Sequence, residues 1–192
     1  NIRWVEMDLC FAFHFMNGFD VDGVISIDAC EYSHAPLFSK PSGEGSGPAD
    51  PYLSRWTIDM NAGDPRAVSK RIDENKSEFP QCDLRYAGKP YRHGWYTASG
   101  GEGESELVKS ENLFNVVGHF DHVTGEVDSF SCGPCHVSES IFVPASENAA
   151  EAEGHLLSVV TSYETHTSSL FVFNALEVAA GPVAKVHLSH RI

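Results

Sequence analysis

Short segments rich in β-branched and aromatic residues recur along the chain, and clusters of turn-forming residues separate them. The segments are 23–32, 52–59, 91–98, 113–120, 155–163 and 169–174. Such residues favour pleated strands, and stretches of this length punctuated by turns are typical of all-β proteins. Only residues 147–153 fit a helical turn, and no longer helix is expected. The sequence therefore predicts an all-β fold.

A loose repeat organises these segments. A predicted strand ends at Asp or Asn, a few turn residues follow, a glycine closes the turn, and another strand begins. The three occurrences are Asp59 with Gly63, Asp121 with Gly125, and Asn174 with Gly181. Their spacing is close to the length of a four-stranded propeller blade. This favours a partial β-propeller over a sandwich, with residues 1–192 as a single partial domain.

Composition limits the class of partner. A formal net charge of −14 argues against nucleic acid and anionic membrane surfaces, since both attract basic patches. No apolar run is long enough to cross a bilayer, so no transmembrane segment is expected. Five cysteines do not form the even framework of a small secreted domain, which points to a reducing, cytoplasmic setting.

The ends of the chain and two loop-like stretches complete this outline. The chain starts at Asn1, and residues 186–192 read as a strand still in progress, which predicts a piece of a longer protein. The stretches 41–51 and 100–106 are rich in glycine or acidic residues and are expected to be surface loops.

One histidine, His14, is embedded in the apolar segment 11–20. On a regular strand the phenylalanines would share one face, and His14 would lie on the other between Ala12 and Met16. Neither face looks solvated, so a dry interior is expected, where both ring nitrogens need partners. A metal on one nitrogen and a carboxylate on the other would satisfy both. The alternative is a hydrogen-bonded core histidine without metal.

Further motifs complete a resemblance. They are Ser-Glu-Phe-Pro-Gln-Cys-Asp at 77–83 followed by 86–95, Ser-Glu-Ser-Ile-Phe-Val-Pro at 138–144 followed by 154–158, and the closing stretch 182–191. With the His14 segment, they resemble the carotenoid cleavage oxygenase family over essentially the whole chain. That family includes stilbene-cleaving bacterial enzymes and the retinoid isomerase of the eye.

The resemblance implies a seven-bladed propeller that holds one Fe(II) through four histidines, three of them bonded to glutamates. His14 matches the third ligand, in the pattern Phe-His-x-x-Asn. Glu78 and Glu139 match two of the glutamates that orient ligating histidines. The remaining ligands would lie before Asn1 and after Ile192. Phe79 and Tyr32 match positions that line an apolar substrate tunnel, with core packing as the alternative.

The activity implied is that of a non-haem Fe(II) dioxygenase. Neutral imidazoles suit Fe(II), and open coordination positions admit O2. The expected substrate is an apolar polyene or stilbene whose conjugated double bond is cleaved to two carbonyl products. A non-cleaving isomerase and the choice of substrate remain open. The chain alone is expected to be inactive and to aggregate, since one ligand cannot hold iron and open sheets leave unpaired edges.

Two other functions compete with this interpretation. One is a propeller that binds a partner without metal. The other is a redox or haem protein that uses Cys132, Cys135 and His136, because Cys-x-x-Cys is a redox frame and Cys-x-x-Cys-His attaches haem. A redox pair should open a helix, whereas residues 137–143 read as a strand.

Paired histidines offer no stronger metal site. His119 and His122 are three residues apart, as are His187 and His190. On a strand this spacing sends the two side chains to opposite faces, so zinc sites are not expected. The remaining histidines are expected at surfaces and turns.

Overall fold

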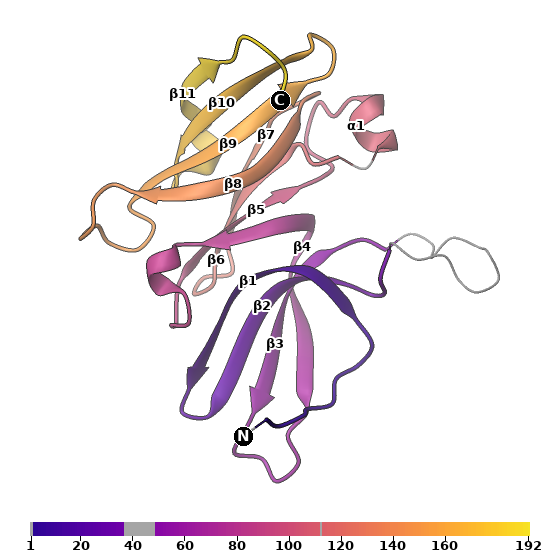
Figure 1. The fold of residues 1–192 in the computed structure, drawn as a ribbon, viewed down its shortest axis with the longest axis vertical. Helices are drawn as coiled ribbons and strands as arrows, with labels where there is room; N and C mark the ends of the chain where they lie inside the picture. Colours follow the sequence, from indigo (N-terminus) through magenta and orange to yellow (C-terminus); the bar gives the residue numbers. More distant parts are fainter. Residues whose placement is uncertain (1, 37–48, 112) are drawn as a thin grey trace, which may run out of the picture.

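The computed structural model describes residues 2–36, 49–111 and 113–192, and within them strands dominate (Figure 1). The strands are β1 (Phe11–Val21), β2 (Val24–Tyr32), β3 (Tyr52–Asp59), β4 (Ala67–Cys82), β5 (His93–Ala98), β6 (Val116–Asp121), β7 (Val127–Ser131), β8 (His136–Pro144), β9 (Gly154–Ser162), β10 (Thr167–Asn174) and β11 (Pro182–His187). The helical elements are η1 (Leu84–Tyr86), α1 (Glu106–Ser110) and η2 (Val178–Ala180).

The strands form three antiparallel four-stranded units. A seven-stranded sheet runs β1 to β7 in chain order, and a four-stranded sheet contains β8 to β11. The long strand β4 belongs to two units, because its part up to Lys76 pairs with β3 and its part from Ser77 pairs with β5. We call β1 to Lys76 the first unit, Ser77 to β7 the second unit, and β8 to β11 the third unit.

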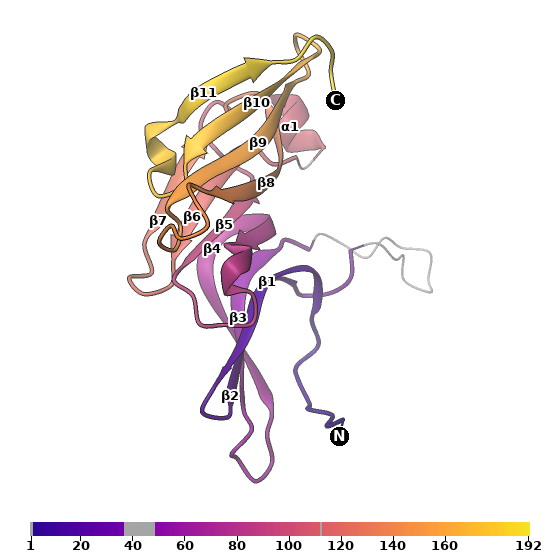
Figure 2. The same ribbon diagram turned by 60° about the vertical axis from the view of Figure 1, so that its left-hand side comes forward.

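The first strands of the three units are neighbours in space. Strand β1 contacts β4, and β4 contacts β8. The units succeed one another along the long axis of the molecule, with the N-terminus at the end of the first unit and the third unit at the opposite end (Figures 1 and 2). Meandering four-stranded sheets that follow one another in this way are propeller blades, so the fold is a partial β-propeller with open sheets.

The sequence repeat coincides with the last hairpin of each unit. It lies between β3 and β4, between β6 and β7, and between β10 and β11. In each case the side-chain oxygen of the repeat's first residue accepts a backbone N–H two residues on, from Asn61, Val123 and Leu176 respectively. These turns are closed by Asp or Asn side chains, which explains why the repeat is visible in the sequence.

Several sequence expectations differ from the structure. Residues 147–153 form turns rather than a helix, and the short α-helix lies at α1, where the Ser105 hydroxyl accepts the Val108 N–H. The final stretch is strand only as far as His187. The predicted loop 41–51 falls outside the described residues except for 49–51.

Two apolar cores lie between consecutive units. The first, between the first and second units, contains Met16, Cys30, Leu53, Cys82, Tyr91, Tyr96, Ala98, Val116 and Phe120. The second, between the second and third units, contains Trp95, Val117, Val137, Ala152, Leu156, Val160, Phe173, Ala175 and Val178. Packing between units therefore holds the first strands in place.

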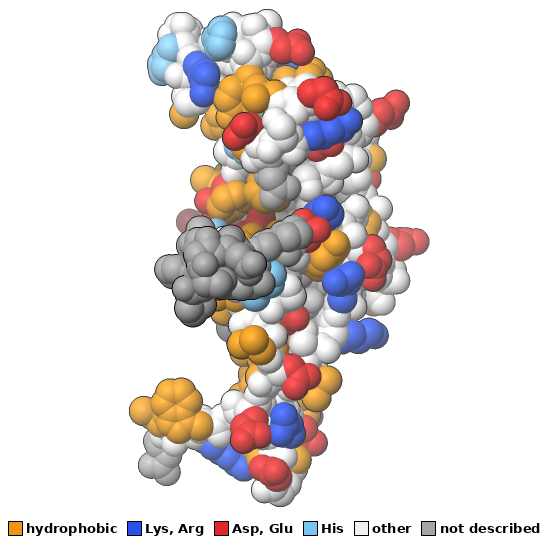
Figure 3. Space-filling model, turned by 90° about the vertical axis from the view of Figure 1, so that its right-hand side faces the viewer, with side chains coloured by type: hydrophobic (Ala, Val, Ile, Leu, Met, Phe, Trp, Pro, Cys, Tyr) orange, Lys and Arg blue, Asp and Glu red, His pale blue; other side chains and the backbone are white. Residues whose placement is uncertain are grey.

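The surface shows charges of both signs. On the face drawn in Figure 3, Lys and Arg side chains are interspersed with Asp and Glu, and no basic stripe is seen there. No helix among the described residues has the length and apolar character needed to span a membrane.

Candidate metal-ligand site

His14 lies on β1, the edge strand of the seven-stranded sheet. Register shifts occur between Ala12 and Phe15 and again between Phe15 and Asn17, so the alternation of faces along β1 is broken. The side chain of His14 is 47% exposed. The expectation of a regular strand with His14 in a dry interior is therefore wrong for this chain, because β1 is bulged and pairs on one side only.

Asn17, the last residue of the Phe-His-x-x-Asn pattern, fixes β1 to the turn after η1. Its side-chain amide donates to the carbonyl oxygens of Tyr86 and Lys89, both at 3.1 Å, and its Oδ1 accepts the Gly88 N–H at 3.0 Å. This role of Asn17 was not predicted from the sequence. Its position three residues after His14, in an otherwise apolar segment, was the feature that could have indicated it.

Glu78 holds His14. The Nδ1 atom of His14 lies 2.6 Å from Oε2 of Glu78, whose residue is only 3% exposed. A carboxylate oxygen accepts hydrogen bonds, so Nδ1 is the donor in this contact and Nε2 is the nitrogen left for another partner. Among the described residues Nε2 has no hydrogen-bond partner. The pair therefore presents one oriented imidazole nitrogen to the outside.

The backbone at Phe79 is bent around the same carboxylate. Phe79 has a φ of +51°, a left-handed conformation that bulky residues rarely adopt, and the β4–β5 register shifts between Glu78 and Gln81. The Phe79 N–H donates to Glu78 Oε2 at 2.7 Å. Its ring lies 5.0 Å from the His14 ring. Backbone strain of this kind is retained where a site needs it.

Tyr32 lies on the buried side of this group. Its ring meets Phe13 edge-on at 5.4 Å and Phe11 at 6.4 Å. Burial and then the Glu78 charge raise the pKa of the Tyr32 hydroxyl well above its usual value. The structure thus brings Tyr32 and Phe79 to the His14–Glu78 pair, with Tyr32 packed in the interior and Phe79 partly exposed.

Glu139 lies on a different strand and is exposed. It stands on β8, where the register shifts between Val137 and Ser140, and its carboxylate accepts a hydrogen bond from the side-chain amide of Gln81 on β4. It does not contact the His14–Glu78 pair; Gln81 is its neighbour instead.

The three predicted residues share one structural feature. His14, Glu78 and Glu139 each occupy the first strand of a unit, and each lies within or at the edge of a register shift in that strand. A bulge removes a residue from the regular ladder and re-aims its side chain. Side chains at three such positions can converge on a region that the ladder would not allow.

Of the predicted ligand set, His14 alone belongs to this chain. Among the described residues no three His, Cys, Asp or Glu side chains are placed to hold a metal ion together. Whether the residues suit a metal ion is therefore judged from His14 and Glu78 alone. An exposed Nε2, whose opposite nitrogen is held by a buried carboxylate, is the arrangement that metal-ligating histidines use.

The Cys132–Cys135 pair lacks the features of a redox site. Both thiols are free, and burial raises the pKa of Cys132 to about 12 and also raises that of Cys135. Reactive thiols have a lowered pKa. Strand β8 begins at His136, whose Nδ1 lies 3.1 Å from the Phe114 carbonyl oxygen.

Three other histidines are partly or fully buried, and of these only His93 was among those expected at surfaces and turns. His93 Nδ1 lies 3.0 Å from His119 Nε2, and His122 Nδ1 accepts from Arg55. Burial lowers the pKa of His119 and of His122 to about 4. His119 faces Trp95 in the second core and His122 faces Tyr91 beside the first, so the two do lie on opposite sides of β6.

The open four-stranded sheets are those of a partial β-propeller, and the first of them carries a histidine held by a buried carboxylate. The family of the retinal pigment epithelial membrane protein matches residues 1–192, and the chain belongs to this family. Lignostilbene-alpha,beta-dioxygenase isozyme III of Sphingomonas paucimobilis is 35% identical over the whole chain. Isoeugenol monooxygenase of Pseudomonas nitroreducens is 29% identical over the whole chain. The chain spans 41% of the length of each of these relatives.

Solved structures agree with this assignment. The crystal structure of Pseudomonas brassicacearum lignostilbene dioxygenase matches 99% of this chain and 42% of its own, with a TM-score of 0.90 and 30% identity. The cobalt-substituted Synechocystis ACO structure matches 95% of this chain and 37% of its own, with a TM-score of 0.79 and 26% identity.

Proposed function

We propose that this chain is the C-terminal part of a non-haem Fe(II) dioxygenase that cleaves a conjugated carbon–carbon double bond with O2. The products would be two carbonyl compounds. The observation that carries the proposal is the His14–Glu78 pair, in which a buried carboxylate fixes the ring and leaves Nε2 exposed. The names of the relatives, a lignostilbene dioxygenase and several carotenoid cleavage oxygenases, support the reaction class.

Each residue would have a separate task. His14 would hold iron through Nε2, and Glu78 would keep the proton on Nδ1 and make Nε2 a better donor. Glu139 would accept the far N–H of another ligating histidine outside this chain. Bound Fe(II) would supply coordination positions that admit O2.

The surroundings of His14 suit an apolar substrate. The Phe79 ring lies against His14 and 5.8 Å from the Phe114 ring, and both phenylalanines are partly exposed. Apolar walls with few polar groups are typical of sites for small hydrophobic molecules. A polyene or a stilbene fits this chemistry.

The first test is iron content in the longest reading frame that contains this chain, compared with its His14→Ala variant. We expect near-stoichiometric iron in the parent and a large loss on substitution. His155→Ala serves as the control, because His155 is an exposed histidine on β9. Iron that is absent from the parent, or unchanged by His14→Ala, would favour a propeller that binds a partner without metal.

The second test separates holding the ring from binding the metal. Glu78→Gln keeps the size of the side chain but removes the charge that favours the Nδ1–H tautomer. We expect weaker iron binding than in the parent and stronger binding than in His14→Ala. The purified 192-residue chain is expected to show no double-bond cleavage, and detectable cleavage would contradict this.

A further inference from the structure

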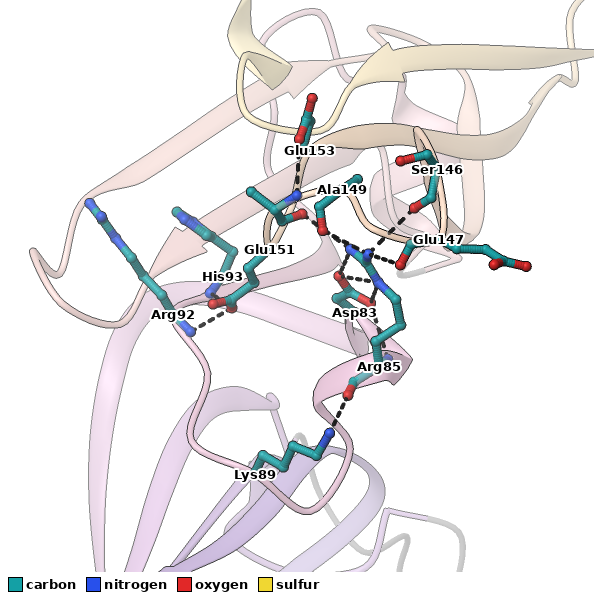
Figure 4. A network of polar contacts seen from close by, with 11 residues as sticks. Asp83, Arg85, Lys89, Arg92, His93, Ser146, Glu147, Ala149, Glu151 and Glu153 are labelled. Carbon is teal, nitrogen blue, oxygen red and sulfur yellow. Dashed lines mark hydrogen bonds and ion pairs between the residues drawn. The ribbon is translucent and has the colours of Figure 1, made fainter.

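The loop 145–153 joins β8 to β9 in the third unit and is gripped by residues of the second unit (Figure 4). The grip lies away from the His14–Glu78 pair. It involves Arg85, which lies in η1 directly after β4, and Glu151 of the loop itself.

Arg85 holds the loop by its backbone carbonyl groups. Its guanidinium pairs with the buried carboxylate of Asp83, with Nη2 at 2.5 Å from Oδ2. The same group points its remaining donors at the loop, as Figure 4 shows. The accepting carbonyl oxygens are those of Ala149 at 2.8 Å, Ala150 at 3.1 Å, Glu147 at 3.4 Å and Ser146 at 3.5 Å.

Glu151 anchors the other end of the loop. Here the loop supplies the acceptor and the second unit supplies the donors. Its Oε1 accepts the backbone N–H of Arg92 at 2.6 Å and that of His93 at 2.9 Å. The next residue, Ala152, is fully buried and has a φ of +64°, which L-residues seldom adopt. The loop is thus held in a strained conformation by one side chain from each partner.

These contacts join the loop after β8 to η1, which follows β4, through Arg85, and to the start of β5 through Glu151. Asp83 follows the last residue of β4, and the loop follows the last residue of β8. The same two strands carry Gln81 and Glu139, whose side chains are hydrogen-bonded. The planar, many-donor guanidinium fixes direction as well as distance, which a flexible ammonium cannot do. The first and second units share β4, whereas the second and third share no strand among the described residues. The relative position of these last two sheets therefore depends on contacts such as those of Arg85 and Glu151.

We propose that Arg85 and Glu151 are positioning residues that hold the loop after β8 against η1 and the start of β5, and thereby place the Glu139 carboxylate beside Gln81 of β4. This inference rests on the proposed function, in which Glu139 orients a ligating histidine. It adds two residues that touch neither metal nor substrate but determine where that carboxylate lies.

The test compares Arg85→Gln and Glu151→Gln with Arg92→Gln in the complete reading frame. Arg92 is a matched control, since its side chain makes a similar two-pronged pair with Asp121 and it keeps the backbone N–H that Glu151 accepts. The first readout is the NMR signal of the Gln81 side-chain amide in the metal-free protein. We expect the Gln81 amide signal to shift in Arg85→Gln and in Glu151→Gln and to keep its position in Arg92→Gln.

The second readout is a double-mutant cycle on kcat. Arg85→Gln and Glu139→Gln are each expected to lower kcat about tenfold with little change in KM, and the double variant is expected to be no slower than the worse single variant. Arg85→Lys is expected not to restore kcat, because it lacks the planar fork.

Additive effects on kcat, or an unmoved Gln81 amide in Arg85→Gln, would overturn the positioning role. If His14→Ala loses iron but the kcat effects of Arg85→Gln and Glu139→Gln are additive, only the positioning role is contradicted. Retention of iron in His14→Ala would instead sink the proposed function.

Discussion

The two junctions between the units differ in how the neighbouring sheets are joined. The first and second units share strand β4, which pairs with β3 in one unit and with β5 in the other. A buried ion pair, Asp28–Arg55, lies between these two units. The second and third units share no strand among the described residues. They are joined by stacked aromatic rings and by the contacts of Arg85 and Glu151 at the loop 145–153.

The first junction surrounds a charged group. Asp28 is fully buried and receives both Nε and Nη2 of Arg55 at 2.7 Å and the Tyr91 hydroxyl at 2.6 Å. His122 lies against the same guanidinium, with Nδ1 3.0 Å from Nη2. Every charge in this cluster has a partner, which is the condition for burying it.

The second junction surrounds Trp95, which is fully buried. Its ring stacks on Phe142 at 4.8 Å with an interplanar angle of 7°, and Nε1 donates to the Ala175 carbonyl oxygen at 2.8 Å. Buried ion pairs fix geometry but add little net stability, whereas apolar area adds most of it. Each junction buries an apolar core and one ion pair, Asp28–Arg55 in the first and Asp83–Arg85 in the second, so the shared strand β4 is the main difference between them.

Trp95→Ala should have the largest effect, because it removes the centre of the second junction. We expect a loss of about 4 kcal/mol in the free energy of unfolding, from the lost transfer energy and the cavity left behind. Urea unfolding monitored by circular dichroism measures it. Trp56→Ala is the control, since Trp56 lies on β3, is only partly buried and belongs to neither core, and a similar loss there would show that the effect of Trp95→Ala is not specific to the second junction.

Asp28→Ala should have the next largest effect. It leaves the Arg55 guanidinium and the Tyr91 hydroxyl without their acceptor in the first junction. Removing one member of a buried pair costs about 3 kcal/mol, with some relief here because Arg55 is partly exposed. Asp121→Ala, which breaks the more exposed pair with Arg92, should cost less in the same urea titration. Equal losses would contradict the special character of the first junction.

Acid should weaken both junctions through their histidines. Burial lowers the pKa of His119 and His122 to about 4 in the folded protein, below the ordinary value of 6.5. Below pH 6.5 the unfolded chain binds protons that the folded chain does not, so stability falls between about pH 6.5 and pH 4. Each histidine should account for roughly 2 kcal/mol of that fall.

Single substitutions assign the acid effect to a junction. His119→Gln should remove the part that belongs to the second junction, and His122→Gln the part that belongs to the first. The measurement is urea unfolding at pH 7 and pH 4.5, with the exposed His155→Gln as control. If each variant loses as much stability on acidification as the parent, neither histidine is responsible.

The sequence predicted the hairpin repeat, because an Asp or Asn side chain closes each turn locally. Asp59, Asp121 and Asn174 cap their own turns and need no tertiary context. The repeat predicted a strand after Gly63, but the extent of β4 was missed because it is rich in charged residues over much of its length and changes partners at Lys76 and Ser77. No period of apolar residues marks such a strand.

The candidate site was found by residue type, but its geometry was not. The motifs placed His14 and Glu78 in one family pattern, and the structure joins them at 2.6 Å across strands 64 residues apart in sequence. The bulges that expose His14 and the left-handed turn at Phe79 follow from hydrogen bonds between strands. Such contacts are non-local, so local patterns could not give them.

The smallest expected effect comes from Cys132 and Cys135, which lie at the margin of the second core. Their raised pKa values leave little thiolate at neutral pH, so a thiol reagent should label them slowly in the folded protein and rapidly in urea. Replacing both with Ala should lower the free energy of unfolding by less than about 1 kcal/mol, because the side chains are small and only partly packed. Rapid labelling of the folded protein would contradict this and revive a redox role. Slow labelling would show that the margin of the second junction stays closed in the folded protein although no strand is shared there.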